Sequence, residues 1–458
     1  MVEAAVVHES DNKEHITARL VEFAKVVAWS DLPESVRHEG RRAFTNAVGC
    51  LVGGAKHQLV ETASAALLPF SGAPEATLVG RGARADCLTA ALINGLSGAA
   101  YSFDDTYGEA MLHPGGPLAA ALLAVCEYKP TSGERLICAF TTGLELACRL
   151  TKALTMPPAK AEMAWSQTGI SCGIAVGLAT GKLLGLDRQQ LAWTAGIASA
   201  SASGTRVTHG SMAASLIFGQ AAQNGLRAAI LALHGFTGPP HAIEGQFGVA
   251  EVFAYEAHLS SLVDGLGEQF ELLGNTYKPF PCGLVIHPAL DGLLRLRAEA
   301  AIDPAAIEAI ELVVSPKAIA FASRADPADD LEAKISLHHW IAAAALTGRA
   351  GLAEGTLEMV RDPRVAALRA KIMVEGDPAL AADAARVVIT LSDGTSRRIA
   401  IDHCVGSREH PMSDIQIEQK FIGQAALVIG EDRARALFQA ASDIARLSDA
   451  AVVAQMAA

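Results

Sequence analysis

The sequence predicts a mainly α-helical protein, built from a large all-helical domain and a smaller inserted α+β lid domain. Its 458 residues exceed what one hydrophobic core normally serves, so we expect two domains or one domain with an insertion. Hydrophobic residues make up 51% of the chain but aromatic residues only 5%, and the 41 glycines favour helices that pack closely. Helical spacing of apolar residues dominates, and alternation typical of strands is confined to a late segment.

From about residue 14 to 265 the pattern predicts successive helices. Turn-forming segments separate them, for example SGAPEA at 71–76 and GFTGPP at 235–240. Gly185 is placed to end one helix, and Asp187 is placed to cap the next. No repeat of fixed period is present in the sequence, which argues against a solenoid. Residues 1–269 are therefore predicted to form the first part of the helical domain.

The pattern changes after about residue 270. Ile307–Ser315 alternates as a strand does, and Arg386–Leu391, Asp393–Gly394 and Arg397–Ile401 together give a strong hairpin signal. Two segments between these strands have helical spacing, 329–348 and 363–371. We therefore predict an α+β lid domain at 270–405, followed by helices at 406–458 that return to the helical domain.

Charge and cysteine usage exclude several functional classes. The net charge is −12 with dispersed Lys and Arg, so nucleic acid is not an expected partner, and an anionic substrate would need a locally basic pocket. The eight cysteines lack paired spacing, which predicts neither a metal site nor disulfides. The first 15 residues are too charged for a signal peptide, and the apolar stretch Ile170–Leu186 is too short to span a membrane. The expected compartment is the cytoplasm.

The densest polar group runs from Ser102 to Tyr107 and continues at His113–Gly116. It lies between two apolar segments predicted to be helices, Ala90–Ala100 and Pro117–Cys126. Carboxylates, hydroxyls and an imidazole on a loop between buried helices are suited to proton transfer, because desolvation tunes their pKa values. The alternative is that Asp104 and Asp105 only cap local backbone groups while the glycines turn the chain.

A second polar group, Tyr277–Cys282 followed by His287, opens the α+β segment. Two prolines make this loop rigid, and Lys278 is placed to bind a carboxylate. The alternative is an ordinary solvated lysine.

The stretch NGLSGAAYSFDDT…HPGGPLAAALLA at 94–124 resembles a signature of the MmgE/PrpD family. Six further blocks resemble the family in the same order: GLELACR (143–149), GKLLGLD (181–187), GQAAQNGLRAAILALHGFTGP (219–239), YKPFPCGLVIH (277–287), EAKISLHHWIAAAALTG (332–348) and HPMSDIQIEQKF (410–421). The resemblance covers nearly the whole chain. It implies a helical domain, an α+β lid, an active site between them, a homodimer, and catalysis without metal or organic cofactor.

The match to the family is incomplete at several site positions. Aligned residues that match are Asp105, Thr106, His113, Lys278 and Cys282, and His339 aligns with a tyrosine of the family's lid. Residues that differ are Ser102, where lyase members have Asp, Ser166 and Ala99, where they have His, and Ala214, where they have Lys. The differences remove acids that dehydration and decarboxylation use.

Three functions remain open on this basis. The first is an epimerase that moves a proton at a carbon next to a carboxylate of a small polycarboxylate, resembling iminodisuccinate epimerase. The second is a lyase of the 2-methylcitrate dehydratase or cis-aconitate decarboxylase type, and the third is a non-catalytic binding relative. Candidate catalytic residues are His113, Asp105, Lys278, Tyr107 and His339, with Asp105 raising the basicity of the imidazole. Candidate substrate-binding residues are Thr106, Arg206, His209 and Cys282.

Overall fold

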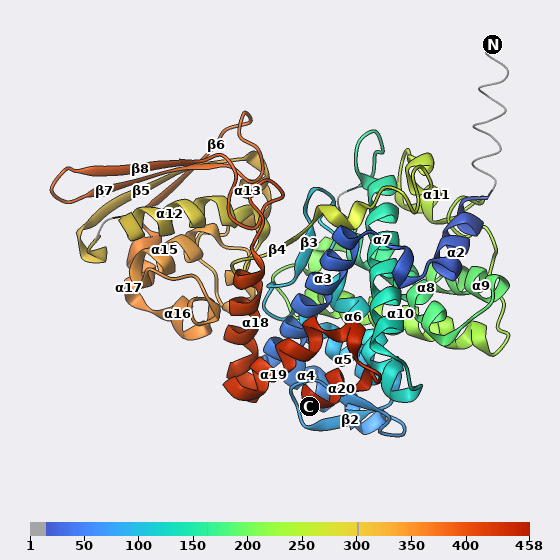
Figure 1. Ribbon diagram of the computed structural model, residues 1–458. Helices are drawn as coiled ribbons and strands as arrows, with labels where there is room; N and C mark the ends of the chain where they lie inside the picture. Colours follow the sequence, from blue (N-terminus) through green and yellow to red (C-terminus); the bar gives the residue numbers. More distant parts are fainter. Residues whose placement is uncertain (1–14, 163, 300–301) are drawn as a thin grey trace, which may run out of the picture.

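The computed structural model describes residues 15–162, 164–299 and 302–458, and its fold is mainly helical with a smaller α+β domain (Figure 1). The prediction for the N-terminal segment concerns residues 1–14, which lie outside the described residues. The helices of the helical domain are α2 (Ile16–Val26), α3 (Glu34–Gly54), α4 (Gln58–Leu67), α5 (Cys87–Ala99), α6 (Gly115–Tyr128), α7 (Gly133–Thr155), α8 (Gly173–Leu184), α9 (Arg188–Ser199), α10 (Ala213–Leu233) and α11 (Val249–Phe253). They pack around α6 and α8, which are almost entirely buried.

Close packing through small side chains is confirmed at the contact between α5 and α10. A Cβ atom added at Gly95 would lie 2.8 Å from the Cα of Gly219, so the two backbones touch at this point. Because no larger side chain fits there, the high glycine content of the sequence has a direct structural cause.

The predicted helix boundary near residue 185 is confirmed. Gly185 ends α8 in the left-handed conformation with φ of 84°, and the Asp187 carboxylate accepts a hydrogen bond from the Gln190 backbone N–H. Helical spacing did not predict the π-helical turn Thr168–Cys172 or the short ladder of β1 (Ala76–Leu78) with β2 (Ala83–Ala85). Three-residue strands are too short to show an alternating pattern.

The α+β domain contains one sheet with strand order β6-β5-β7-β8. Its strands are β5 (Ile307–Val314), β6 (Ile372–Gly376), β7 (Ala385–Leu391) and β8 (Ser396–Ile401). The predicted hairpin joins β7 to β8, and Gly394 takes the positive φ of 81° that its turn requires. Mostly exposed side chains conceal β6 in the sequence, and it pairs in parallel with β5.

Helices cover one face of this sheet, and they are α12 (His287–Glu299), α13 (Pro316–Ala322), α14 (Asp330–Ala333), α15 (Leu337–Thr347), α16 (Leu357–Arg361) and α17 (Pro363–Arg369). The α17 start is as predicted, with Asp362 capping and Pro363 in the first position. The single helix expected at 329–348 is divided, because the chain turns after Ala333 and Ser336 caps a new helix.

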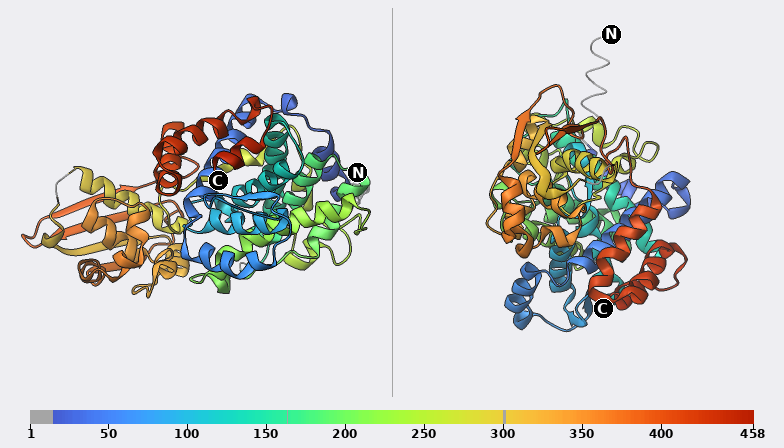
Figure 2. Two further views of the ribbon diagram at one scale, coloured as in Figure 1. Left: turned by 90° about the horizontal axis from the view of Figure 1, so that it is seen from below. Right: turned by 90° about the vertical axis from the view of Figure 1, so that its left-hand side faces the viewer.

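The chain then returns to the helical domain through α18 (Asp414–Ile429), α19 (Glu431–Ser442) and α20 (Ala451–Met456). Phe421 and Gln424 of α18 lie directly over Gly49 and Gly53 of α3. Figures 1 and 2 show α18 at the junction of the two domains. No helix in the described part of the chain is long and apolar enough to cross a membrane.

The two domains also touch beside the loop at 102–107. Lys334 of the α+β domain donates a hydrogen bond to the carbonyl of Ala100, and the Asp330 carboxylate lies 3.2 Å from Nε2 of His57. The polar loop found in the sequence therefore lies at the domain junction.

Candidate active site

A short antiparallel ladder brings together the two polar segments that the sequence shows far apart. β3 (Asp105–Tyr107) pairs with β4 (Asn275–Tyr277), and the Thr276 hydroxyl adds a 2.7 Å hydrogen bond to the Thr106 carbonyl. Lys278 follows β4 directly, and Asp104 precedes β3 directly. Since Asp105 and Tyr277 are ladder partners, Lys278 and Asp104 are brought to the same end of the ladder.

Asp104 lies between a lysine and a histidine. Its Oδ1 accepts a 2.7 Å hydrogen bond from Lys278 Nζ, and its Oδ2 lies 3.2 Å from Nδ1 of His113. Burial by itself would raise the pKa of Asp104, but Lys278 and His113 hold that pKa well below its ordinary value. Asp104 is therefore a permanent anion at neutral pH.

The contacts of His113 define its tautomer. Nδ1 faces the Asp104 carboxylate, the Asp105 carbonyl at 3.1 Å and the Thr106 hydroxyl at 3.0 Å. Because carboxylates and carbonyls only accept hydrogen bonds, Nδ1 carries the proton and Nε2 is left to exchange one. The His113 side chain is 22% exposed, so this nitrogen is within reach of a small molecule.

Surrounding elements fix the position of His113. Its backbone N–H donates a 3.0 Å hydrogen bond to the hydroxyl of Thr168, in the π-helical turn, and its ring lies 5.6 Å from the Phe218 ring of α10. A π-helical turn in contact with a proton-transfer residue fits the frequent occurrence of such turns at functional sites.

The prediction that the Asp105 carboxylate orients His113 is corrected. That carboxylate accepts hydrogen bonds from Gly115 N–H at 3.1 Å and Asn275 Nδ2 at 2.9 Å, at the start of α6. Consecutive side chains of an extended segment point in opposite directions, so only Asp104 reaches the imidazole. Burial, and then the neighbouring Asp104 charge, raise the pKa of Asp105 to about 6.

Lys278 is more enclosed than the sequence suggested. Only 2% of the residue is exposed, and a second hydrogen bond of 3.2 Å joins its Nζ to the Ser102 hydroxyl. Ser102 has a positive φ of 52°, a strained conformation at the point where the loop leaves α5. Lys278 therefore contributes positive charge beside His113 from a buried position.

Arg206 and His209 lie near this cluster, on the loop between α9 and α10. Arg206 donates a 3.1 Å hydrogen bond to the Trp165 carbonyl. The His209 ring is open to solvent although protein atoms surround it on most sides. Partial desolvation and the positive charges of Arg206, His113 and Lys278 lower its pKa to about 4. His209 is thus a neutral imidazole beside a group of cations.

Three predicted site residues point elsewhere. The Tyr107 hydroxyl bonds to Glu271 at 2.7 Å, on the side of β3 away from His113. His339 Nε2 lies 2.8 Å from the Glu354 carbonyl inside the α+β domain, and Cys282 is fully buried in that domain's core. Thr106 does join the cluster, through His113. Sequence position alone did not separate these cases because it does not give side-chain direction.

Two residues of the cluster were missed as functional candidates. Asp104 was considered only for capping, and Lys420 received no role. Lys420 lies on α18, more than 300 residues after Asp104 in the sequence, and its ammonium group is 4.3 Å from the centre of the Phe103 ring. No local pattern in the sequence indicates such a contact.

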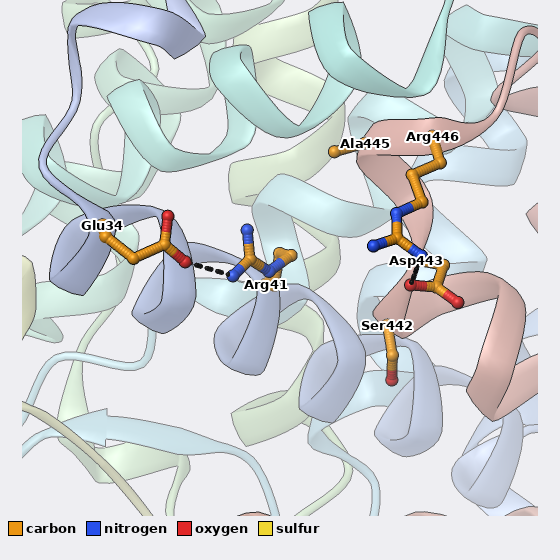
Figure 3. A pocket seen from close by; sticks show the side chains of 6 residues that line it. All are labelled: Glu34, Arg41, Ser442, Asp443, Ala445 and Arg446. Atoms are coloured by element: carbon orange, nitrogen blue, oxygen red, sulfur yellow. Dashed lines mark hydrogen bonds and ion pairs between the residues drawn. The ribbon is translucent and has the colours of Figure 1, made fainter.

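Within the described residues, no group of three His, Cys, Asp or Glu side chains is arranged to hold a metal ion. A surface recess of the helical domain is lined by Glu34, Arg41, Ser442, Asp443, Ala445 and Arg446 (Figure 3). Both arginines there already pair with carboxylates, at 2.9 Å for Arg41 with Glu34 and 3.5 Å for Arg446 with Asp443. The recess thus offers no unpaired charge to an anion.

Comparison with known proteins finds matches along most of the chain. The family model of the MmgE/PrpD N-terminal domain matches residues 18–261, and that of the MmgE/PrpD C-terminal domain matches residues 280–444. A cis-aconitate decarboxylase from Aspergillus terreus is 25% identical, with 96% of this chain and 95% of the relative covered. The cis-aconitate decarboxylases of Homo sapiens and Mus musculus are 24% and 25% identical, each covering 80% of this chain and 78% of the relative.

Proposed function

Since the chain belongs to the MmgE/PrpD family, we propose that it is an enzyme that transfers a proton at a carbon next to a carboxylate of a small polycarboxylate, as a lyase of the decarboxylase type. The observation that carries this proposal is the arrangement of Asp104, His113 and Lys278, in which one imidazole is prepared for proton transfer beside buried positive charge. The names of the curated relatives favour decarboxylation over the epimerisation predicted from the sequence.

In the proposed reaction, His113 acts as the acid. The ionised Asp104 stabilises an imidazolium whose Nδ1–H faces the carboxylate and whose Nε2–H faces the substrate. The bond from carbon to one carboxylate breaks, carbon dioxide leaves, and the electron pair stays on carbon. His113 Nε2 gives its proton to that carbon and regains one from water afterwards.

Positive charge near His113 has two tasks in this scheme. Arg206 is suited to binding a substrate carboxylate that is retained, because its guanidinium presents several donors. Lys278 stabilises the negative charge that develops as carbon dioxide departs, although it does so from behind the Asp104 carboxylate.

Epimerisation is the second candidate, and one observation favours it. A proton must be removed from one face of the carbon and returned to the other, which is simplest with two bases. His209 supplies a second neutral imidazole in the same charged neighbourhood as His113. The residues that were expected to share this work, Tyr107 and His339, lie outside the cluster.

Incubation with a panel of di- and tricarboxylates in deuterated water, followed by NMR and mass spectrometry, tests both candidates. Loss of carbon dioxide with one deuterium in the product supports the lyase. Deuterium exchange with inversion and no loss of mass supports the epimerase. The two also differ in pH dependence, because an acid must be protonated and activity then falls as pH rises, whereas a base loses activity as pH falls. No exchange and no product with any member of the panel, under conditions where the protein is folded, would refute catalysis.

A further inference from the structure

Lys420 is a buried cation behind the acidic loop. The residue is 8% exposed, and among the described residues its Nζ has no hydrogen-bond partner. It faces the Phe103 ring at 4.3 Å, and Phe103 directly precedes Asp104. A buried ammonium without a partner costs folding free energy, and this cost calls for a compensating role.

The charges around Lys420 come from several elements. Asp104 and Asp105 of the loop attract it, Lys278 repels it, and the buried Cys50 thiol of α3 and His287 of α12 also lie within range. Burial lowers the pKa of Lys420 to about 8, a value at which it is still mostly protonated at neutral pH. The two adjacent aspartates thus have Lys278 in front and Lys420 behind.

α18 also supports the loop through a second contact. Gln424 lies one turn after Lys420, and its Nε2 is 3.7 Å from the Cys50 sulfur, which in turn lies 3.2 Å from the Phe103 carbonyl. The C-terminal helix therefore holds Phe103 from both the ring and the backbone side.

We propose that Lys420 is a positioning residue of the candidate active site, whose charge behind Phe103 balances the paired aspartates and so sets the pH at which His113 changes protonation. This inference rests on the proposed role of His113 in proton transfer. Without Lys420 the cluster carries one more uncompensated negative charge, which favours the imidazolium. The His113 titration then moves to higher pH.

The direct test is a histidine titration by NMR on the full-length protein labelled with ¹³C-histidine, with the His113 signal assigned from His113→Gln. In Lys420→Met we expect the His113 midpoint to rise by about half to one pH unit, as one charge at intermediate dielectric produces. Lys420→Arg keeps the charge and should leave the midpoint unchanged. Lys182→Met is the matched control, because Lys182 is a partly buried lysine of α8 that donates to the carbonyls of Ala24 and Val27 instead.

Two further readouts separate positioning from packing. The melting temperature of Lys420→Met should equal or exceed that of the wild type, because a buried charge is replaced by an apolar side chain of similar size. With an active substrate, the limb of the pH–rate profile that reports His113 should move with the NMR midpoint. Lys420→Gln serves as a second neutral variant if Lys420→Met does not fold.

An unchanged His113 midpoint in the neutral variants overturns the proposal, and so does an equal shift in Lys182→Met. The NMR titration needs no turnover, so failure of the proposed function is recognised separately as absence of any reaction in the wild type.

Discussion

Replacing Asp104 by Asn tests the centre of the candidate site. The carboxylate is 3% exposed and pairs with Lys278 Nζ at 2.7 Å, so the change leaves a buried ammonium without its counter-charge. Removing one partner of a buried pair costs about 3–5 kcal/mol of unfolding free energy. Catalysis should fall by about two to four decades, because the amide no longer stabilises the imidazolium or the correct tautomer.

Asp105→Asn provides the matched comparison at the next residue. With a pKa raised to about 6 in the folded state, Asp105 weakens the fold by about 3 kcal/mol at pH above 6, and this penalty disappears as pH falls below about 4. Asn removes the penalty but pairs poorly with Gly115 N–H or Asn275, which costs about 1–3 kcal/mol. The two effects nearly cancel, so stability at pH 7 should change little.

Urea unfolding at pH 7 and pH 4, together with the turnover assay, measures both variants. The stability of the wild type relative to Asp105→Asn should increase by about 3 kcal/mol from pH 7 to pH 4. The double variant Asp104→Asn with Lys278→Met should recover part of the stability lost in Asp104→Asn, because no unpaired charge remains. Equal stability and equal activity of Asp104→Asn and the wild type would refute the assigned geometry.

Four other outcomes are expected. His113→Ala should lower kcat by about two to four decades while the circular dichroism spectrum is retained, and a folded, nearly fully active variant would move the chemistry elsewhere. Lys278→Ala should raise KM and also lower the melting temperature, since Asp104 then lies buried and unpaired; an unaltered KM with a verified substrate would exclude a role in binding. Light scattering should report a homodimer, because the closely packed helices leave apolar surface to cover, and a monomer at micromolar concentration would contradict this. Activity should survive exhaustive dialysis against a chelator, whereas loss restored by one divalent ion would establish a metal requirement.

The sequence by itself determined the fold class and much of the helical boundaries. Periodicity of 3.6 and 2 residues is local information, so the hairpin at Gly394, the cap at Asp187 and the Pro363 helix start could be predicted. Elements with weak local patterns were missed, namely the largely exposed β6 and the three-residue strands β3 and β4.

The sequence also indicated which two loops carry the polar groups, and it ranked His113 and Lys278 among the candidates. It did not give side-chain direction, and a change of one position along an extended segment reverses that direction. For this reason Asp105 was assigned the contact that Asp104 makes, and Tyr107 was included although its hydroxyl bonds to Glu271.

Only the tertiary structure decided which residues meet. The ladder of β3 with β4 joins positions about 170 residues apart and places Lys278 on Asp104, while α18 brings Lys420 behind the same loop from the end of the chain. These contacts depend on how the α+β domain is inserted and how the chain returns from it. Local periodicity contains no term for such long-range pairing, so the charge balance around His113 is a property of the folded chain alone.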